Sequence, residues 1–297
     1  GIAIYRWFNV KEKGNASSFL LTGSFLGPVI GPAATVALLS IFGWHMVFIL
    51  FGLVGFVMAY FWYKYVPENP ADSPYVNKEE LAFIQEGRGT ADTKKEVAPW
   101  GKLFRSTQFW AIGIQYFITD YVMFVFLSWL PLYLMEVHGF SLAKMGMWAA
   151  LPWLTLIIIT FGAGYVCDKA IAAGGSQYWI RTITGASGIV LCSIALYMAT
   201  LTPDPMWNVM WLSISLGSLG MTFNASWACA INLGGKFAGS VSGWMNFWGN
   251  VGGVIAPTLT AWIATAYSWD AALLATAFSG IIGVIAWLFV RPDKSIV

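Results

Sequence analysis

One carboxylate stands alone inside a long apolar segment of this chain. Asp120 lies near the middle of residues 108–133 and is the only charged side chain deep within any such segment. A lone carboxylate at the centre of a bilayer costs about 2.5–3.5 kcal/mol on insertion scales, so Asp120 must face a partner, a cavity or water, or carry a proton. Tyr116, Phe124 and Ser128 lie at multiples of four residues from Asp120 and share its helix face.

Three roles are open for this carboxylate. Asp120 binds a proton and couples it to the movement of a solute, or accepts hydrogen bonds from solute hydroxyl groups or a cation, or bonds to a neighbouring helix. An ionised Asp120 repels an anionic solute, which favours protonation when such a solute binds, or a less acidic solute. An Asp120→Asn variant separates these roles, because an unchanged pH dependence removes the proton role.

Side-chain amides form a second group of candidates. Asn246 and Asn250 are one helical turn apart and face the same direction, and Asn224 is a similar amide in the preceding apolar segment. Buried amides without partners are costly, and each amide both donates and accepts hydrogen bonds. These groups suit the hydroxyls and carboxylates of a polar solute, or hydrogen bonding between helices. Trp129 lies deep in its segment, where it lines a cavity or fills one.

The composition is that of an integral membrane protein. Hydrophobic residues make up 58% of the chain and charged residues 10%, whereas soluble domains carry about 25% charged residues. A span needs about 20 mostly apolar residues. The chain has eight such stretches, at about 17–40, 44–65, 108–133, 144–167, 181–201, 207–231, 239–265 and 270–290. No nucleophile–base pair or metal-ligand cluster lies within them, so we expect no enzyme activity and no cofactor or metal.

The basic residues predict how the spans are oriented. If the polar 66–104 loop is cytoplasmic, 15 of the 16 Lys and Arg residues lie on the cytoplasmic side and only Lys144 lies outside. The C-terminus is then also cytoplasmic. Within the loop, Asn77 followed by Glu80 has the form of a helix start, which predicts a short surface helix through Gln85. The basic residues are dispersed over loops, so we expect no nucleic-acid partner.

Two stretches of the chain are copies of one another, 225 residues apart. The ungapped match gives 12 identities over residues 11–67, among them Pro32 with Pro257, Trp44 with Trp269 and Gly55 with Gly280. A long-period repeat in a membrane chain is typical of a transporter built from two similar halves. The block that precedes the second copy has no counterpart before the first, so we expect the chain to be a fragment.

Several motifs carry a family resemblance. They are Arg6-Trp7-Phe8 with Glu12-Lys13-Gly14, Gly23 to Pro28, Ser128-Trp129-Leu130-Pro131-Leu132-Tyr133-Leu134, and Gly243 to Gly253 with its Asn-Phe-Trp-Gly-Asn core. With the repeat and the long basic loop, they resemble the major facilitator superfamily and, within it, the anion:cation symporter family of bacterial sugar-acid carriers for hexuronates, glucarate and galactonate.

The resemblance implies an all-α membrane fold with about eight transmembrane helices present, helices 5 to 12 of the superfamily. Residues 1–65 then hold the end of helix 4 with helices 5 and 6, 66–104 form the cytoplasmic central loop, and 105–297 form a complete six-helix second half. The implied activity is secondary active transport of a small organic anion by alternating access, coupled to a cation such as H⁺. We expect a monomer in a lipid bilayer, the bacterial inner membrane.

The resemblance also assigns roles to single residues. Gly164 to Lys169 resembles the superfamily's loop motif, which makes Asp168, with Arg181, a cytoplasmic gate placed against the start of helix 5. A carboxylate near a helix N-terminus is stabilised by about 0.3–1 kcal/mol when exposed. The alternative to a gate is that Asp168 is an ordinary charged residue of a solvated loop. Ser24 stands where a galactonate carrier has a substrate-contacting Gln, and Asp120 stands where related carriers have Asn.

Two other functions remain open. In the first, the chain belongs to a facilitator or exchanger of another small polar solute, with Asp120 as a binding group. In the second, it belongs to a membrane sensor that has the same fold and does not transport. A pH-dependent flux argues against both, whereas ligand binding without flux supports the sensor.

Overall fold

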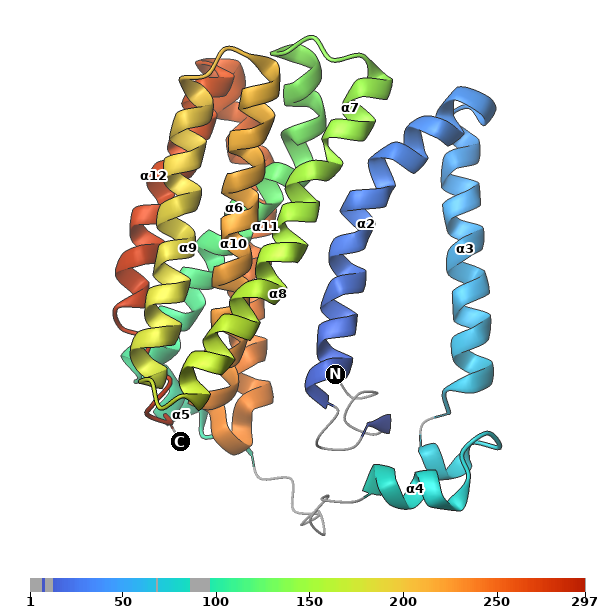
Figure 1. Cartoon of the computed structure of the whole chain (residues 1–297), viewed down its shortest axis with the longest axis vertical. Helices are drawn as coiled ribbons and strands as arrows, with labels where there is room; N and C mark the ends of the chain where they lie inside the picture. Colours follow the sequence, from blue (N-terminus) through green and yellow to red (C-terminus); the bar gives the residue numbers. More distant parts are fainter. Residues whose placement is uncertain (1–6, 9–12, 68, 86–96, 297) are drawn as a thin grey trace. The chain divides into compact units, whose positions relative to one another are not determined.

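The computed structural model describes residues 7–8, 13–67, 69–85 and 97–296. The side chains of 13–22, 85 and 236 lie outside this description. The chain divides into two compact units, Gly1–Glu96 and Val97–Val297, and the division falls within the long polar loop. All regular elements of the described residues are helices (Figure 1).

The first unit is a pair of long helices followed by short ones. Its elements are α2 (Lys13–Phe42), α3 (Trp44–Tyr65), the 3₁₀ turn η1 (Pro70–Asp72) and α4 (Lys78–Gln85). Gly43, with φ of 75°, makes the turn between α2 and α3, a conformation that favours glycine. The amide of Glu80 donates to Asn77 Oδ1 at 2.7 Å, so the predicted surface helix and its cap are confirmed.

The second unit is a bundle of six long helical segments. Its elements are α5 (Trp100–Phe104), α6 (Thr107–Glu136), α7 (Leu142–Trp148), α8 (Ala150–Ala172), α9 (Gln177–Thr200), α10 (Pro205–Gly234), η2 (Gly235–Phe237), α11 (Ala238–Ala266) and α12 (Trp269–Trp287). The expected single span at 144–167 lies within one apolar stretch, Leu142–Ala172, whose helix is interrupted at Ala149 between α7 and α8. Pro152 explains the break, because it has no N–H to donate to the carbonyl of Trp148.

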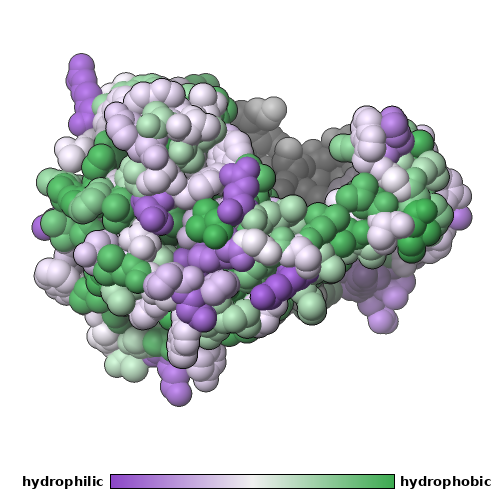
Figure 2. Space-filling model, turned by 90° about the horizontal axis from the view of Figure 1, so that it is seen from above, coloured by the Kyte–Doolittle hydropathy of each residue, from purple (hydrophilic) through white to green (hydrophobic). Residues whose placement is uncertain are grey.

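Six of the described helical segments are long and apolar enough to cross a membrane, and α10 and α11 are not among them. Both are long enough, but they carry many glycine and polar residues. The polar side chains of α10 bond inside the bundle, as in the 2.9 Å bond from Thr222 Oγ1 to the carbonyl of Gly185. Large hydrophobic residues are exposed on both units (Figure 2), as a bilayer requires.

Glycines bring α11 close to α6. A Cβ at Gly252 would lie 2.6 Å from the carbonyl oxygen of Phe117, and one at Gly253 would lie 2.6 Å from the ring of Phe124. Small residues at such positions let helix backbones approach closely within a membrane. Gly243, nearer the start of α11, has nothing within 4 Å of its Cβ position. The close α6–α11 contact positions the candidate site.

Candidate functional site

Asp120 lies buried between α6 and α11, with only 5% of its surface exposed. Its Oδ1 has no hydrogen-bond partner among the residues that the structure describes. On the facing helix, a Cβ at Gly249 would overlap Asp120 Oδ2 and lie 2.8 Å from the ring of Tyr116. The carboxylate therefore occupies a narrow slot whose far wall is a glycine.

Tyr116 joins this slot to α10. Its hydroxyl accepts a 3.1 Å hydrogen bond from the indole N–H of Trp227, and the two rings meet edge to face. One residue earlier on each helix, Ser226 Oγ donates to Oε1 of the fully buried Gln115 at 3.1 Å. Two side-chain hydrogen bonds thus hold α6 against α10 beside Asp120.

The amides of α11 lie on a neighbouring face of that helix. Asn246 and Asn250 are both exposed, and Asn250 Nδ2 donates to the carbonyl of Asn246 at 2.8 Å. They flank Gly249, which faces α6. The structure therefore brings Asp120 and Tyr116 together opposite Gly249, whereas the amide pair lies on an exposed face of α11. Ser24 lies exposed on α2, in the first unit.

A second polar cluster lies where α8 ends and α9 begins. Arg181 donates to Asp168 Oδ1 at 2.6 Å and to Asn224 Oδ1 at 2.9 Å. Arg181 is 8% exposed, whereas the side chain of Asp168 is 72% exposed. The two gate candidates form an ion pair, and the structure places Asn224 with them rather than with the α11 amides. Asp168 and the start of α2 lie in different units, and the side chains of 16–18 are outside the described residues.

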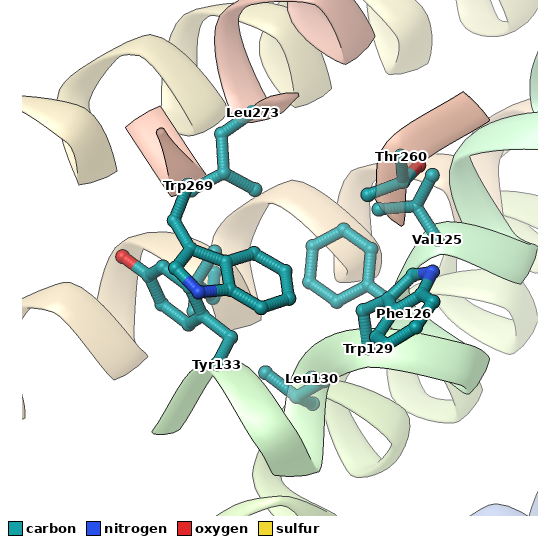
Figure 3. A pocket seen from close by; sticks show the side chains of 9 residues that line it. Val125, Phe126, Trp129, Leu130, Tyr133, Thr260, Trp269 and Leu273 are labelled. Atoms are coloured by element: carbon teal, nitrogen blue, oxygen red, sulfur yellow. The ribbon is translucent and has the colours of Figure 1, made fainter. Parts of the chain in front are cut away.

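Trp129 lines a small apolar pocket away from Asp120. Its indole N–H donates to the carbonyl of Pro257 at 3.0 Å. The pocket residues are Val125, Phe126, Trp129, Leu130, Tyr133, Leu212, Thr260, Trp269 and Leu273. Figure 3 shows Trp129 and Trp269 on opposite sides of it. An apolar pocket does not suit a charged solute, so we keep the polar residues around Asp120 as the candidate site.

Sequence reasoning missed two members of the site. Gln115 is an uncharged amide within an apolar span, which is itself a signal for a functional or structural hydrogen bond. Trp227 carries no charge and no motif that singles it out, and its bond to Tyr116 joins residues 111 positions apart. No spacing rule could reveal that pairing.

We expect a Gly249→Ala variant to lose stability and transport together. The added methyl group would displace Asp120 or the Tyr116 ring, and overpacking of a tight core costs about 1–3 kcal/mol. Thermal unfolding of the purified protein measures the loss. Gly243→Ala is the matched control on the same helix, since its Cβ meets nothing within 4 Å. Equal stability of the two variants would contradict the narrow slot.

The loop after α6 gives a pH-dependent prediction. Burial lowers the pKa of His138 below its usual value, while Asn208, Asp270 and Asp204 oppose the shift. The unfolded chain then binds the proton more readily, so this stability is present above the unfolded pKa and is lost as pH falls. Thermal unfolding between about pH 7 and about pH 5 should show a smaller loss in His138→Gln than in the wild type. Parallel curves would exclude this role.

Comparison with known proteins places the chain among membrane carriers. The family described as Major Facilitator Superfamily matches residues 1–257. The ascorbate transporter of Arabidopsis thaliana chloroplasts is 28% identical over 290 residues, which cover 97% of this chain and 53% of that protein. The probable galactarate/D-glucarate transporter GudP of Bacillus subtilis is 31% identical over 313 residues, covering 100% of this chain and 67% of that protein.

A solved structure shares the fold. The bacterial homologue of the human lysosomal transporter Spinster, in an inward-facing and unoccupied conformation, superposes with a TM-score of 0.66. The match covers 97% of this chain and 73% of that one at 15% identity. The chain spans about half the length of several curated relatives that it matches. The family match, the shared fold and the apolar helices agree, and the chain belongs to the major facilitator superfamily.

Proposed function

We propose that this chain forms part of a secondary active transporter that moves a small organic anion, a sugar acid, together with protons. The observation that carries the proposal is the buried Asp120, whose Oδ1 has no partner among the described residues and whose Oδ2 faces Gly249 of α11, the helix that carries the exposed Asn246 and Asn250. Members of the superfamily are multi-pass membrane transporters and not enzymes. The relatives named for ascorbate and for galactarate/D-glucarate support a small hydroxylated acid as substrate.

The amide pair provides the substrate contacts in this proposal. Asn246 and Asn250 offer donors and acceptors to hydroxyl and carboxylate groups. Tyr116 lies beside Asp120 on α6. Trp129 lines the apolar pocket instead, and Ser24 lies exposed on α2 of the first unit. Asn224 is engaged by Arg181, so we assign it to the gate.

Asp120 supplies the coupling. A protonated Asp120 is neutral, which removes the repulsion that an ionised carboxylate exerts on an anionic substrate. An ionised Asp120 in a narrow slot is unfavourable, so release of its proton is linked to a change in its surroundings. Proton binding and anion binding therefore favour one another, which is the condition for symport.

The Asp168–Arg181 ion pair acts as the cytoplasmic gate. In this proposal the chain lies in the bacterial inner membrane with residues 66–104 and the C-terminus in the cytoplasm, because that threading places 15 of 16 basic residues inside. The transporter works as a monomer and needs no cofactor or metal.

Uptake by the complete gene product in liposomes tests this function. A panel of sugar acids is offered with and without an inward proton gradient, and we expect the gradient to stimulate uptake of one of them. Uptake that ignores the gradient would replace symport by facilitation or exchange and make Asp120 a binding residue. Binding of an acid without any flux would indicate a sensor instead.

A further inference from the structure

We propose that Trp227 is a positioning residue that holds the Asp120 carboxyl in its slot by fixing Tyr116. The inference rests on the proposed role of Asp120, and it concerns a residue on a different helix that does not touch the carboxyl. Trp227 lies on α10, and its indole N–H donates to the hydroxyl of Tyr116 at 3.1 Å.

The ring of Tyr116 forms one wall of the slot. The carboxylate Oδ2 and the Tyr116 ring both reach the position that a Cβ of Gly249 would occupy, so the three groups are in direct proximity. Tyr116 and Asp120 are four residues apart on α6 and lie one above the other on the same face. Any rotation of the ring therefore opens or closes the space around the carboxyl.

Two aromatic residues of α10 hold that ring. Phe223 and Trp227 meet the Tyr116 ring edge to face, at centroid distances of 5.8 Å and 6.2 Å. Edge-to-face contacts restrain a ring but allow it to slide, whereas a hydrogen bond to its hydroxyl fixes its end. The Trp227 N–H supplies that bond, and Tyr116 is only 4% exposed, so water does not readily replace it.

Loss of the indole N–H should let the Tyr116 ring move more freely beside Asp120, while the aromatic side chains around the carboxyl remain in place. Trp227→Phe keeps an aromatic ring against Tyr116 and removes only the donor, and Tyr116→Phe removes the acceptor. Both variants should give water and small reagents more access to Asp120. Loss of one hydrogen bond corresponds to about a fivefold change in such an opening equilibrium.

Two measurements on the complete gene product test the inference. The first is the rate at which dicyclohexylcarbodiimide labels Asp120, followed by mass spectrometry, which requires no transport. We expect Trp227→Phe and Tyr116→Phe each to raise this rate about fivefold. The double variant should label no faster than either single variant, because both remove the same bond. Trp244→Phe is the matched control, since it loses a 2.8 Å indole bond to the carbonyl of Phe109 elsewhere on α6.

The second measurement separates positioning from general damage. Proton-driven uptake by Trp227→Phe should fall about fivefold, while substrate exchange without a gradient stays within about twofold of the wild type. A merely structural role would lower both equally. Labelling at the wild-type rate, or at the rate of Trp244→Phe, would overturn the inference, as would additive effects of the two variants. If labelling changes as expected but the wild type shows no proton-driven uptake, the positioning role stands and the proposed function fails.

Discussion

Asp120→Asn should strongly reduce proton-driven accumulation while leaving the protein folded. Asparagine has nearly the same shape as aspartate, so it fits the slot opposite Gly249. Its amide neither binds nor releases a proton near neutral pH. A pH gradient can therefore no longer drive transport through this side chain. We expect uptake driven by an inward proton gradient to fall by about tenfold or more, a loss of about 1.4 kcal/mol of coupling. Uptake measured at several pH values should also become independent of pH.

Two comparisons make this result specific. Asp270→Asn removes an exposed carboxylate in the first turn of α12 and should keep the wild-type pH dependence. Exchange of substrate across the membrane without a gradient should persist in Asp120→Asn, since binding by Asn246 and Asn250 is retained. An Asp120→Asn protein that still accumulates substrate in response to the gradient would leave Asp120 with a structural or binding role only.

Much of the fold follows from the length and composition of the apolar stretches. A stretch of about 20 apolar residues has few alternatives to a membrane helix, because its backbone groups must bond internally. Asp120 could be found for the same reason, since a charge in such a stretch is costly. The surface helix beginning after Asn77 followed from local capping chemistry, which needs only residues 77–80.

What the sequence could not supply is the pairing between helices. Asn224 looked like a substrate-binding amide, yet its oxygen accepts from Arg181, 43 positions away. Trp227 and Tyr116 are likewise brought together by the packing of α10 on α6. Such contacts depend on how helices rotate about their axes, which single-helix periodicity leaves open. The break at Ala149 was different, because Pro152 signals it locally.

Asp168→Ala should slow transport while sparing substrate binding. Arg181 is almost fully buried and is held by the exposed Asp168 and by Asn224. A hydrogen bond between charged groups contributes about 1.5–3 kcal/mol, less at an exposed carboxylate where water screens it. Loss of the ion pair therefore shifts the balance between gate states by roughly tenfold, the equivalent of about 1.4 kcal/mol. Turnover should fall by a similar factor, whereas the substrate Kd should change by less than about twofold, because the pair belongs to α8 and α9 and makes no hydrogen bond to Asn246 or Asn250 of α11 among the described residues.

Asn224→Ala distinguishes a gate from a general structural cluster. It removes the amide acceptor but leaves the 2.6 Å ion pair between Arg181 and Asp168. Since one neutral partner is lost rather than the charged one, turnover should fall by only about two- to threefold, again without a change in Kd. Asp168→Glu, which keeps the charge on a longer side chain, should recover part of the rate that Asp168→Ala loses. Normal turnover in Asp168→Ala would exclude the gate, and a weakened Kd in Asn224→Ala would return that amide to the substrate site. The ratio of turnover to Kd in these three variants therefore decides whether the polar cluster around Arg181 moves with the transport cycle.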